Sequence, residues 1–139
     1  MINMLSSVRR KLYIHAESVY PEECCGFLFG AEVDGFRKII DSLDVPNSEG
    51  TRLDHRFLIT PKHYRMAEEH ARNEGMRLLG FYHSHPDHKA LPTQYDLENG
   101  IPWFLSVIIS VTGGTASHMT AWIMNDSRMR YDQQSMLVL

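Results

Sequence analysis

Three histidines and two aspartates fall within the seventeen residues from Gly80 to Asp96, directly behind an apolar run. His83 and His85 alternate along a segment that is expected to be extended, so both imidazoles should point to the same side. Imidazole is a common metal ligand in proteins. Two imidazoles on one face, at the end of a strand, therefore predict half of a metal site.

The other half can be completed in two ways. Adding Asp87 and His88 gives the H-x-H-x-D-H spacing that is seen in the metallo-β-lactamase superfamily, although that fold usually needs a longer chain and further ligands downstream. Adding Asp96 instead gives two nitrogen ligands and one oxygen ligand. Zinc accepts such a set and keeps its fourth tetrahedral position for water.

Thr93 and Asp96 have the spacing of a helix start, with Thr93 as the N-cap and Asp96 at the third helical position. On these two residues alone, a capped helix without a metal is the favoured interpretation. The histidines ahead of them favour the metal site, because a carboxylate on a fixed first turn is held rigidly.

A hydrolytic zinc site also needs a base that lies near the metal without binding it. Glu22 and Glu23 are the candidates, because they stand directly before an apolar strand that is expected to be buried. The alternative interpretation is a pair of exposed acids at a junction between a helix and a strand.

Three short motifs together resemble the signature of the JAMM (MPN-type) zinc metallopeptidases: E-x-C-G at residues 23–26, H-S-H-P at 83–86 and T-x-x-D at 93–96. The resemblance also covers the order of helices and strands from about Lys11 to Met124. It implies the JAMM/MPN fold, an α/β (α+β) structure with a central mixed β-sheet flanked by helices and cytidine-deaminase-like layering.

Carried over residue by residue, the resemblance implies one Zn2+ per chain, with His83, His85 and Asp96 as its ligands. Glu23 would bind the catalytic water and act as general base and acid, so Glu22 would have no role. The family usually has serine in place of Thr93, where the hydroxyl helps to stabilise the tetrahedral oxyanion. Threonine keeps that hydroxyl but adds a methyl group.

The resemblance also implies a substrate class. The loop from Val45 to Asp54 is short and the stretch from Pro86 to Pro92 is compact, whereas the eukaryotic members that open ubiquitin chains carry longer insertions. The chain thus looks like a stand-alone prokaryotic member. Such relatives cut after the C-terminal diglycine of ubiquitin-like sulfur-carrier proteins, and they release an amino acid, a short peptide or a conjugated lysine.

The expected function is therefore that of a zinc-dependent peptidase or isopeptidase. Two alternatives stay open: a metallo-β-lactamase-like hydrolase that uses the first ligand set, and a non-catalytic MPN-type binding module. Inactive relatives of the family lack the metal ligands, whereas every ligand position is filled here. This difference favours an enzyme.

The N-terminal part of the chain predicts a helix and a hairpin. Apolar residues recur at helical spacing over residues 8–19 after the possible caps Ser6 and Ser7, and Pro21 should end that helix. A buried strand over residues 25–29 should turn at Asp34-Gly35 and return through residues 39–40.

The remaining elements lead to the metal motif and away from it. Residues 57–60 predict a short strand, and Thr60 should cap a second helix that ends at Gly75. A strand over residues 76–82 leads into the histidines, and Tyr82 should face away from His83. A short helix over residues 92–100 and two strands over 104–111 and 118–124, joined by Gly113-Gly114, follow.

Composition limits the remaining possibilities. The 139 residues predict one domain, and 14 basic against 17 acidic side chains give no sign of a nucleic-acid partner. The longest apolar-rich run, residues 103–111, is too short to cross a bilayer. Because Cys24 and Cys25 are adjacent and offer no disulfide framework, a cytoplasmic location is expected. A homodimer is a possible assembly.

Overall fold

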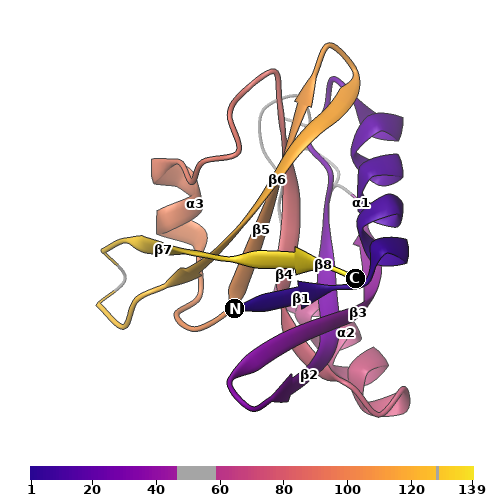
Figure 1. The fold of residues 1–139 in the computed structure, drawn as a ribbon, viewed down its shortest axis with the longest axis vertical. Helices are drawn as coiled ribbons and strands as arrows, with labels where there is room; N and C mark the ends of the chain where they lie inside the picture. Colours follow the sequence, from indigo (N-terminus) through magenta and orange to yellow (C-terminus); the bar gives the residue numbers. More distant parts are fainter. Residues whose placement is uncertain (47–58, 128) are drawn as a thin grey trace.

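A computed structural model describes residues 1–46, 59–127 and 129–139. They form one mixed eight-stranded sheet flanked by helices (Figure 1), as predicted. The helices are α1 (Ser6–Val19), α2 (Pro61–Asn73) and α3 (Gln94–Asn99). The strands are β1 (Ile2–Met4), β2 (Cys25–Val33), β3 (Phe36–Val45), β4 (Arg77–Pro86), β5 (Leu105–Thr112), β6 (Thr115–Met124), β7 (Tyr131–Gln134) and β8 (Met136–Val138). The order across the sheet is β7-β6-β5-β4-β2-β3-β1-β8.

The strand that carries the histidines lies in the middle of the sheet. β4 runs antiparallel to β2 and parallel to β5. β2 and β3 form the predicted hairpin, in which Asp34 and Gly35 have φ angles of 50° and 80°. Positive φ at both positions is typical of the turn that matches the twist of paired strands. Strands on both sides therefore support β4.

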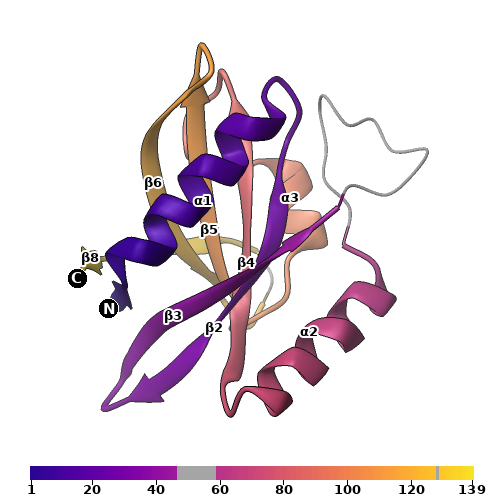
Figure 2. The ribbon, with the colours of Figure 1, turned by 90° about the vertical axis from the view of Figure 1, so that its right-hand side faces the viewer.

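The two faces of β2 and β4 bury different hydrophobic clusters. Leu28 and Tyr82 belong to the cluster under α1, whereas Phe27 and Phe81 belong to the cluster under α2. Because successive side chains of a strand point to opposite faces, the two helices cover opposite sides of these strands (Figure 2). Tyr82 thus faces away from His83, as predicted.

The hydroxyl of Tyr82 ties α1 to the sheet. It donates a hydrogen bond to Asp44 Oδ1 on β3 (3.0 Å) and lies 2.8 Å from Nδ1 of His15 on α1. Burial, with the nearby Asp44 carboxylate, raises the pKa of Tyr82 far above its usual range. The phenol therefore stays neutral and holds the helix in place on the side of β4 opposite the histidines.

The helix boundaries confirm most of the expected signals. Thr60 caps α2 by accepting the N–H of His63 (3.3 Å), and Gly75, with φ of 66°, follows the end of that helix. α1 ends before Pro21, but the prediction of Ser6 or Ser7 as its cap is wrong. Leu5 is the N-cap because the chain enters the helix straight from β1, where the N–H of Leu5 bonds the carbonyl of Ile39 (3.2 Å).

The strand predicted over residues 57–60 can be compared with the structure only at residues 59 and 60. Residues 57 and 58 lie outside the described residues, and Ile59 and Thr60 are not in a strand. The return strand is longer than expected and reaches Val45.

Three strands were not predicted: β1, β7 and β8. β7 and β8 are separated by Ser135 alone, yet they pair with β6 and with β1, at opposite ends of the strand order. The carbonyl of Ser135 accepts the N–H of Ile2 (2.9 Å). The sheet is therefore so strongly curled that one short segment crosses from one edge to the other, as the yellow ribbon in Figure 1 shows.

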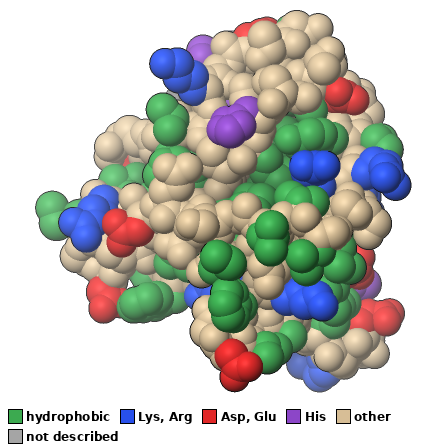
Figure 3. Space-filling view, in the orientation of Figure 1, with side chains coloured by type: hydrophobic (Ala, Val, Ile, Leu, Met, Phe, Trp, Pro, Cys, Tyr) green, Lys and Arg blue, Asp and Glu red, His purple; other side chains and the backbone are tan. Residues whose placement is uncertain are grey.

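The surface over β1, β3 and β8 is partly apolar, and Figure 3 shows hydrophobic side chains gathered on this face. Met1, Phe36, Leu137 and Leu139 are among the exposed large hydrophobic residues. Among the described residues, no helix has the length and apolar character needed to cross a membrane.

Gly80 marks a close approach of β4 to β5, because a Cβ atom there would collide with the carbonyl oxygen of Leu105. We expect Gly80→Ala to lower the free energy of unfolding by about 3 kcal/mol or more, measured by urea denaturation. Gly75→Ala is the matched control: its Cβ would meet nothing within 4 Å, so only the strain of a positive φ is expected, about 1–2 kcal/mol. Equal losses in both variants would contradict the close approach.

Candidate metal centre

The antiparallel pairing of β2 and β4 brings Glu23 to the two histidines. Cys25 pairs with His83 across the ladder. One step further, the N–H of Ser84 donates to the carbonyl of Cys24 (3.1 Å). Glu23 therefore comes opposite the second histidine of the motif, on the same face of the sheet as both imidazoles. Residues that lie sixty positions apart in the sequence become neighbours in this way.

Three ligand-type groups converge within hydrogen-bond distance. The Nε2 atoms of His83 and His85 lie 3.1 Å apart. The Asp96 carboxylate places Oδ1 3.2 Å from Nε2 of His83 and Oδ2 3.3 Å from Nε2 of His85. Ligands at tetrahedral corners around zinc, with bonds of about 2.0–2.1 Å, are separated by about 3.3 Å. The three groups thus fit a metal ion of this size.

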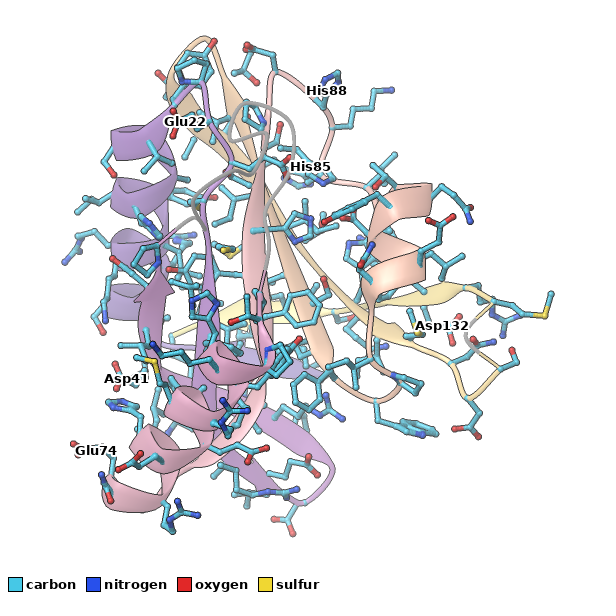
Figure 4. The ribbon with its side chains drawn as sticks, turned by 180° about the vertical axis from the view of Figure 1, so that it is seen from behind. Glu22, Asp41, Glu74, His85, His88 and Asp132 are labelled. Carbon is cyan, nitrogen blue, oxygen red and sulfur yellow. The ribbon has the colours of Figure 1, made fainter. Side chains whose placement is uncertain are left out.

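Glu23 completes the group. Its carboxylate and the two imidazoles offer ligand-type atoms that all lie within 4.8 Å of one another, so this buried set could hold a metal ion. Figure 4 shows His85 at the same end of the molecule as Glu22 and His88, whereas Asp41 and Glu74 lie near the other end. Glu22 is only partly buried and is not a member of the Glu–His–His group.

Asp96 is held by the start of α3. The N–H of Thr93 donates to Oδ2 of Asp96 (2.9 Å), and the N–H of Asp96 donates to Oγ1 of Thr93 (3.1 Å), which confirms the predicted cap. Tyr131, on β7, donates from its hydroxyl to the backbone carbonyl of Asp96 (3.1 Å). The carboxylate therefore faces the histidines from a turn that is fixed on both sides.

His85 is oriented by the loop that follows β4. Its Nδ1 lies 2.8 Å from the carbonyl oxygen of Lys89. A carbonyl can only accept, so Nδ1 carries the proton and Nε2 of the neutral ring keeps its lone pair. A metal-binding imidazole needs this tautomer, and such a second contact commonly fixes it.

The pKa directions agree with a preformed ligand set. Burial lowers the pKa of His83, and the nearby Asp96 only partly offsets this. Burial also acts to lower the pKa of His85, but the hydrogen bonds to Asp96 and to the Lys89 carbonyl raise it above its ordinary value. Although burial alone would raise the pKa of Asp96, His83 and the surrounding hydrogen bonds hold it well below the usual range. Asp96 is thus ionised and His83 neutral, the forms that bind metals.

The group borders a cavity of about 660 Å³, which Glu23, His85, Thr93 and Asp96 help to line. His83 is completely buried, whereas Glu23, His85 and Asp96 keep 5–6% of their surface accessible. Thr93 is exposed at the cavity wall. The group is therefore open to the cavity through Glu23, His85 and Asp96, whereas His83 has no accessible surface.

The structure does not assemble the alternative ligand set. Asp87 is exposed, and its carboxylate accepts hydrogen bonds from the hydroxyl of Tyr20 (2.6 Å) and the N–H of Gly113 (2.9 Å). His88 is exposed on the same loop. Neither belongs to the buried group at His83 and His85. The first completion, H-x-H-x-D-H, is therefore not the arrangement of this chain.

Two supporting residues had no sequence signal. The hydroxyl oxygen of Ser84 accepts the N–H of Cys24 (2.8 Å), which locks β4 to the chain beside Glu23. Lys89 acts through its backbone carbonyl, and any residue supplies a carbonyl. Only the alternation in H-S-H, which turns Ser84 away from the imidazoles, could have suggested that this serine is structural.

Comparisons with known proteins identify the family. The chain matches the model of prokaryotic homologs of the JAB domain over residues 5–125. A search of curated protein sequences finds no match.

Three solved structures are similar over more than nine tenths of their length. A Salinibacter ruber protein is 32% identical, with a TM-score of 0.77 over 99% of this chain and 91% of that one. A Desulfitobacterium hafniense protein has a TM-score of 0.86 at 22% identity, over 100% and 93% of the two chains. A JAB1/MPN domain protein of Archaeoglobus fulgidus has a TM-score of 0.61 at 17% identity, over 100% and 99%. The last two likenesses concern the fold.

The family match spans the three motifs at residues 23–26, 83–86 and 93–96. The first two of these motifs meet because β2 and β4 are neighbours in the sheet. The chain therefore belongs to the prokaryotic homologs of the JAB domain, within the JAMM/MPN family that its motifs predicted.

Proposed function

We propose that this protein is a zinc-dependent peptidase or isopeptidase that hydrolyses the bond after the C-terminal diglycine of a ubiquitin-like sulfur-carrier protein. The observation that carries the proposal is the convergence of His83, His85 and Asp96, whose ligand-type atoms lie 3.1–3.3 Å apart beside the Glu23 carboxylate. Family membership supports it, because the JAMM/MPN family includes metallopeptidases.

The donor set favours zinc. Two imidazole nitrogens and one carboxylate oxygen from the chain, with a cavity in front of them, are typical of a catalytic zinc site with one open position. Zinc bound by His83, His85 and Asp96 would supply a Lewis acid that polarises the substrate carbonyl and lowers the pKa of a water molecule.

Glu23 is suited to move the proton. Glu23 is 6% exposed and lines the cavity, and its carboxylate lies close enough to His85 to raise the pKa of that imidazole. In the proposed reaction it takes a proton from the attacking water and then delivers it to the nitrogen of the leaving amine. The shielded site keeps this carboxylate away from bulk water, which strengthens its electrostatic effect.

Thr93 is suited to stabilise the oxyanion. Its Oγ1 accepts the N–H of Asp96 through a lone pair, which leaves the hydroxyl hydrogen available for donation. The residue lies at the wall of the cavity that contains Glu23 and His85. We propose that it donates to the oxygen that becomes negative during attack on the carbonyl.

The open cavity supports an extended polypeptide tail as the substrate. Glycine is the residue best able to pass where a backbone must approach a metal centre closely, because it has no side chain. The non-catalytic binding module is the remaining alternative, and it predicts purified protein without stoichiometric zinc.

Metal content distinguishes the two ligand sets. We expect Asp96→Ala to lose zinc, with affinity falling more than a hundredfold because a ligand is removed, whereas Asp87→Ala and His88→Ala keep about one zinc per chain. Elemental analysis after dialysis measures this, and circular dichroism checks the fold. Loss of zinc in the second pair of variants and retention in the first would mean that the ligand set is wrong.

Glu23→Gln tests the base. The variant should keep its zinc and its fold, while cleavage of a synthetic peptide that ends in Gly-Gly-Ala falls by about a hundredfold to ten-thousandfold. Glu22→Gln is the matched control and should cleave at the rate of the unchanged protein. Near-normal turnover by Glu23→Gln would overturn the mechanism.

Thr93 can be tested separately from its role as a helix cap. Thr93→Ala should lower turnover about a hundredfold, while Thr93→Ser, which keeps the hydroxyl, should not. Thr60→Ala removes the corresponding cap of α2 and should cost about 1 kcal/mol of stability without a comparable loss of activity. Equal turnover in the alanine and serine variants at position 93 would exclude the oxyanion role.

A further inference from the structure

The candidate ligand Asp96 is held from outside its own helix. Tyr131, on β7, donates from its hydroxyl to the main-chain carbonyl of Asp96 (3.1 Å), although the two residues lie 35 positions apart in the sequence. β7 is at one edge of the sheet, and β6 and β5 lie between it and β4. Figure 1 shows β7 and α3 on the same side of the molecule. The bond therefore joins the sheet edge to the metal centre through α3.

Gly100, which ends α3, leaves the space that this hydroxyl occupies. A Cβ atom at position 100 would collide with the hydroxyl oxygen of Tyr131 and with the terminal methyl group of Met124, and it would lie 3.1 Å from the carbonyl oxygen of Asp96. The two crowded groups are the ends of side chains, so they would move more readily than backbone. Tyr131 thus reaches the helix at a point where another residue would push its hydroxyl away.

The hairpin of β6 and β7 fixes the position from which Tyr131 extends. Tyr131 pairs with Met124 at the end of the ladder. Next to this pair, the N–H of Asn125 donates to the carbonyl of Arg130 (3.1 Å), and Oδ1 of Asn125 accepts the N–H of Arg130 (3.3 Å). The carbonyl of Met124 accepts the N–H of Trp103 (3.3 Å). The strand end that carries the phenol is therefore held by its neighbours.

The cap of α3 cannot place Asp96 against the histidines without help. Its bonds between Thr93 and Asp96 lie within α3, so they orient the carboxylate relative to the helix. The imidazoles belong to β4, and the carboxylate must lie 3.2–3.3 Å from their Nε2 atoms. A helix of six residues depends on contacts with other elements for its position. The bond from Tyr131 is such a contact, and it acts on the residue that supplies the ligand.

We propose that Tyr131 is a positioning residue of the metal centre, which keeps the Asp96 carboxylate at the distance from the two imidazoles that a metal ion requires. This inference rests on the proposed function, because it concerns the same zinc site. Among the described residues that line the cavity, Tyr131 does not occur. It therefore acts through Asp96 and not on the substrate, and it extends the site to a residue outside the three motifs.

Tyr131→Phe removes the hydroxyl and keeps the ring. We expect its zinc affinity, measured by competition with a chelating dye, to fall about tenfold to a hundredfold, as is usual when a partner of a metal ligand is lost. Tyr20→Phe is the matched control, because it removes a hydroxyl that bonds the exposed Asp87 (2.6 Å). It should keep the affinity of the unchanged protein. Circular dichroism and urea denaturation check the fold of both variants.

A spectroscopic readout separates positioning from general stability. The visible absorption of cobalt(II) bound in place of zinc reports the geometry of its ligands. Its bands should shift in Tyr131→Phe and stay unchanged in Tyr20→Phe, even where the two variants have equal stability.

Gly100→Ala tests the same contact while the hydroxyl stays in the protein. The added methyl group should displace the phenol and lower zinc affinity as Tyr131→Phe does. Because both changes break one contact, the double variant should lose no more affinity than either single variant.

Unchanged zinc affinity and unchanged cobalt bands in Tyr131→Phe would overturn the inference. Equal losses in Tyr131→Phe and Tyr20→Phe, or additive losses in the double variant, would also overturn it. Cleavage of the peptide that ends in Gly-Gly-Ala tests the proposed function separately. If zinc affinity depends on Tyr131 but the unchanged protein does not cleave this peptide, the peptidase proposal fails and the positioning role remains. An unchanged protein that binds no zinc would overturn both.

Discussion

The antiparallel register between β2 and β4 is the constraint on which the site depends. Side chains alternate along both strands, so a slip of one residue would turn Glu23 toward the face covered by α1 while the imidazoles stayed in place. Residues outside the site hold the register: Phe27 pairs with Phe81 in the apolar layer under α2, and Ser84 bonds the N–H of Cys24. The burial of two strands thus sets the distance between an acid and its metal centre.

The start of α3 combines local stability with function. At six residues α3 is too short to be stable alone, so it depends on its cap and on packing. The Asp96 carboxylate accepts the N–H of Thr93 and faces both imidazoles at the same time. Its negative charge is also favourable at a helix start. Because the same bonds that begin the helix orient the carboxylate, it lies close to both imidazoles.

The sequence could predict the parts of this structure that have strong local signals. Asp34-Gly35 specified the hairpin, Thr60 and Gly75 bounded α2, and the spacing from Thr93 to Asp96 specified a capped turn. The sequence could also identify the residues whose side chains converge at the candidate metal centre, because the motifs that contain them are specific.

Other features lacked such signals. β1 and β8 have three residues each, too few to show a period, and β7 is mostly polar. The helix start at Leu5 depends on pairing with β3, which is a tertiary contact. The Lys89 carbonyl behind His85 is backbone, so no choice of residue could reveal it.

The loop over residues 88–90, directly after β4, is held in place through its main chain. The carbonyls of His88, Lys89 and Ala90 accept hydrogen bonds, and every amino acid possesses such a carbonyl, whereas His88 and Lys89 also line the cavity. Substitutions of His88 or Lys89 can therefore change the wall of the cavity while the His85 imidazole keeps its hydrogen bond and its orientation.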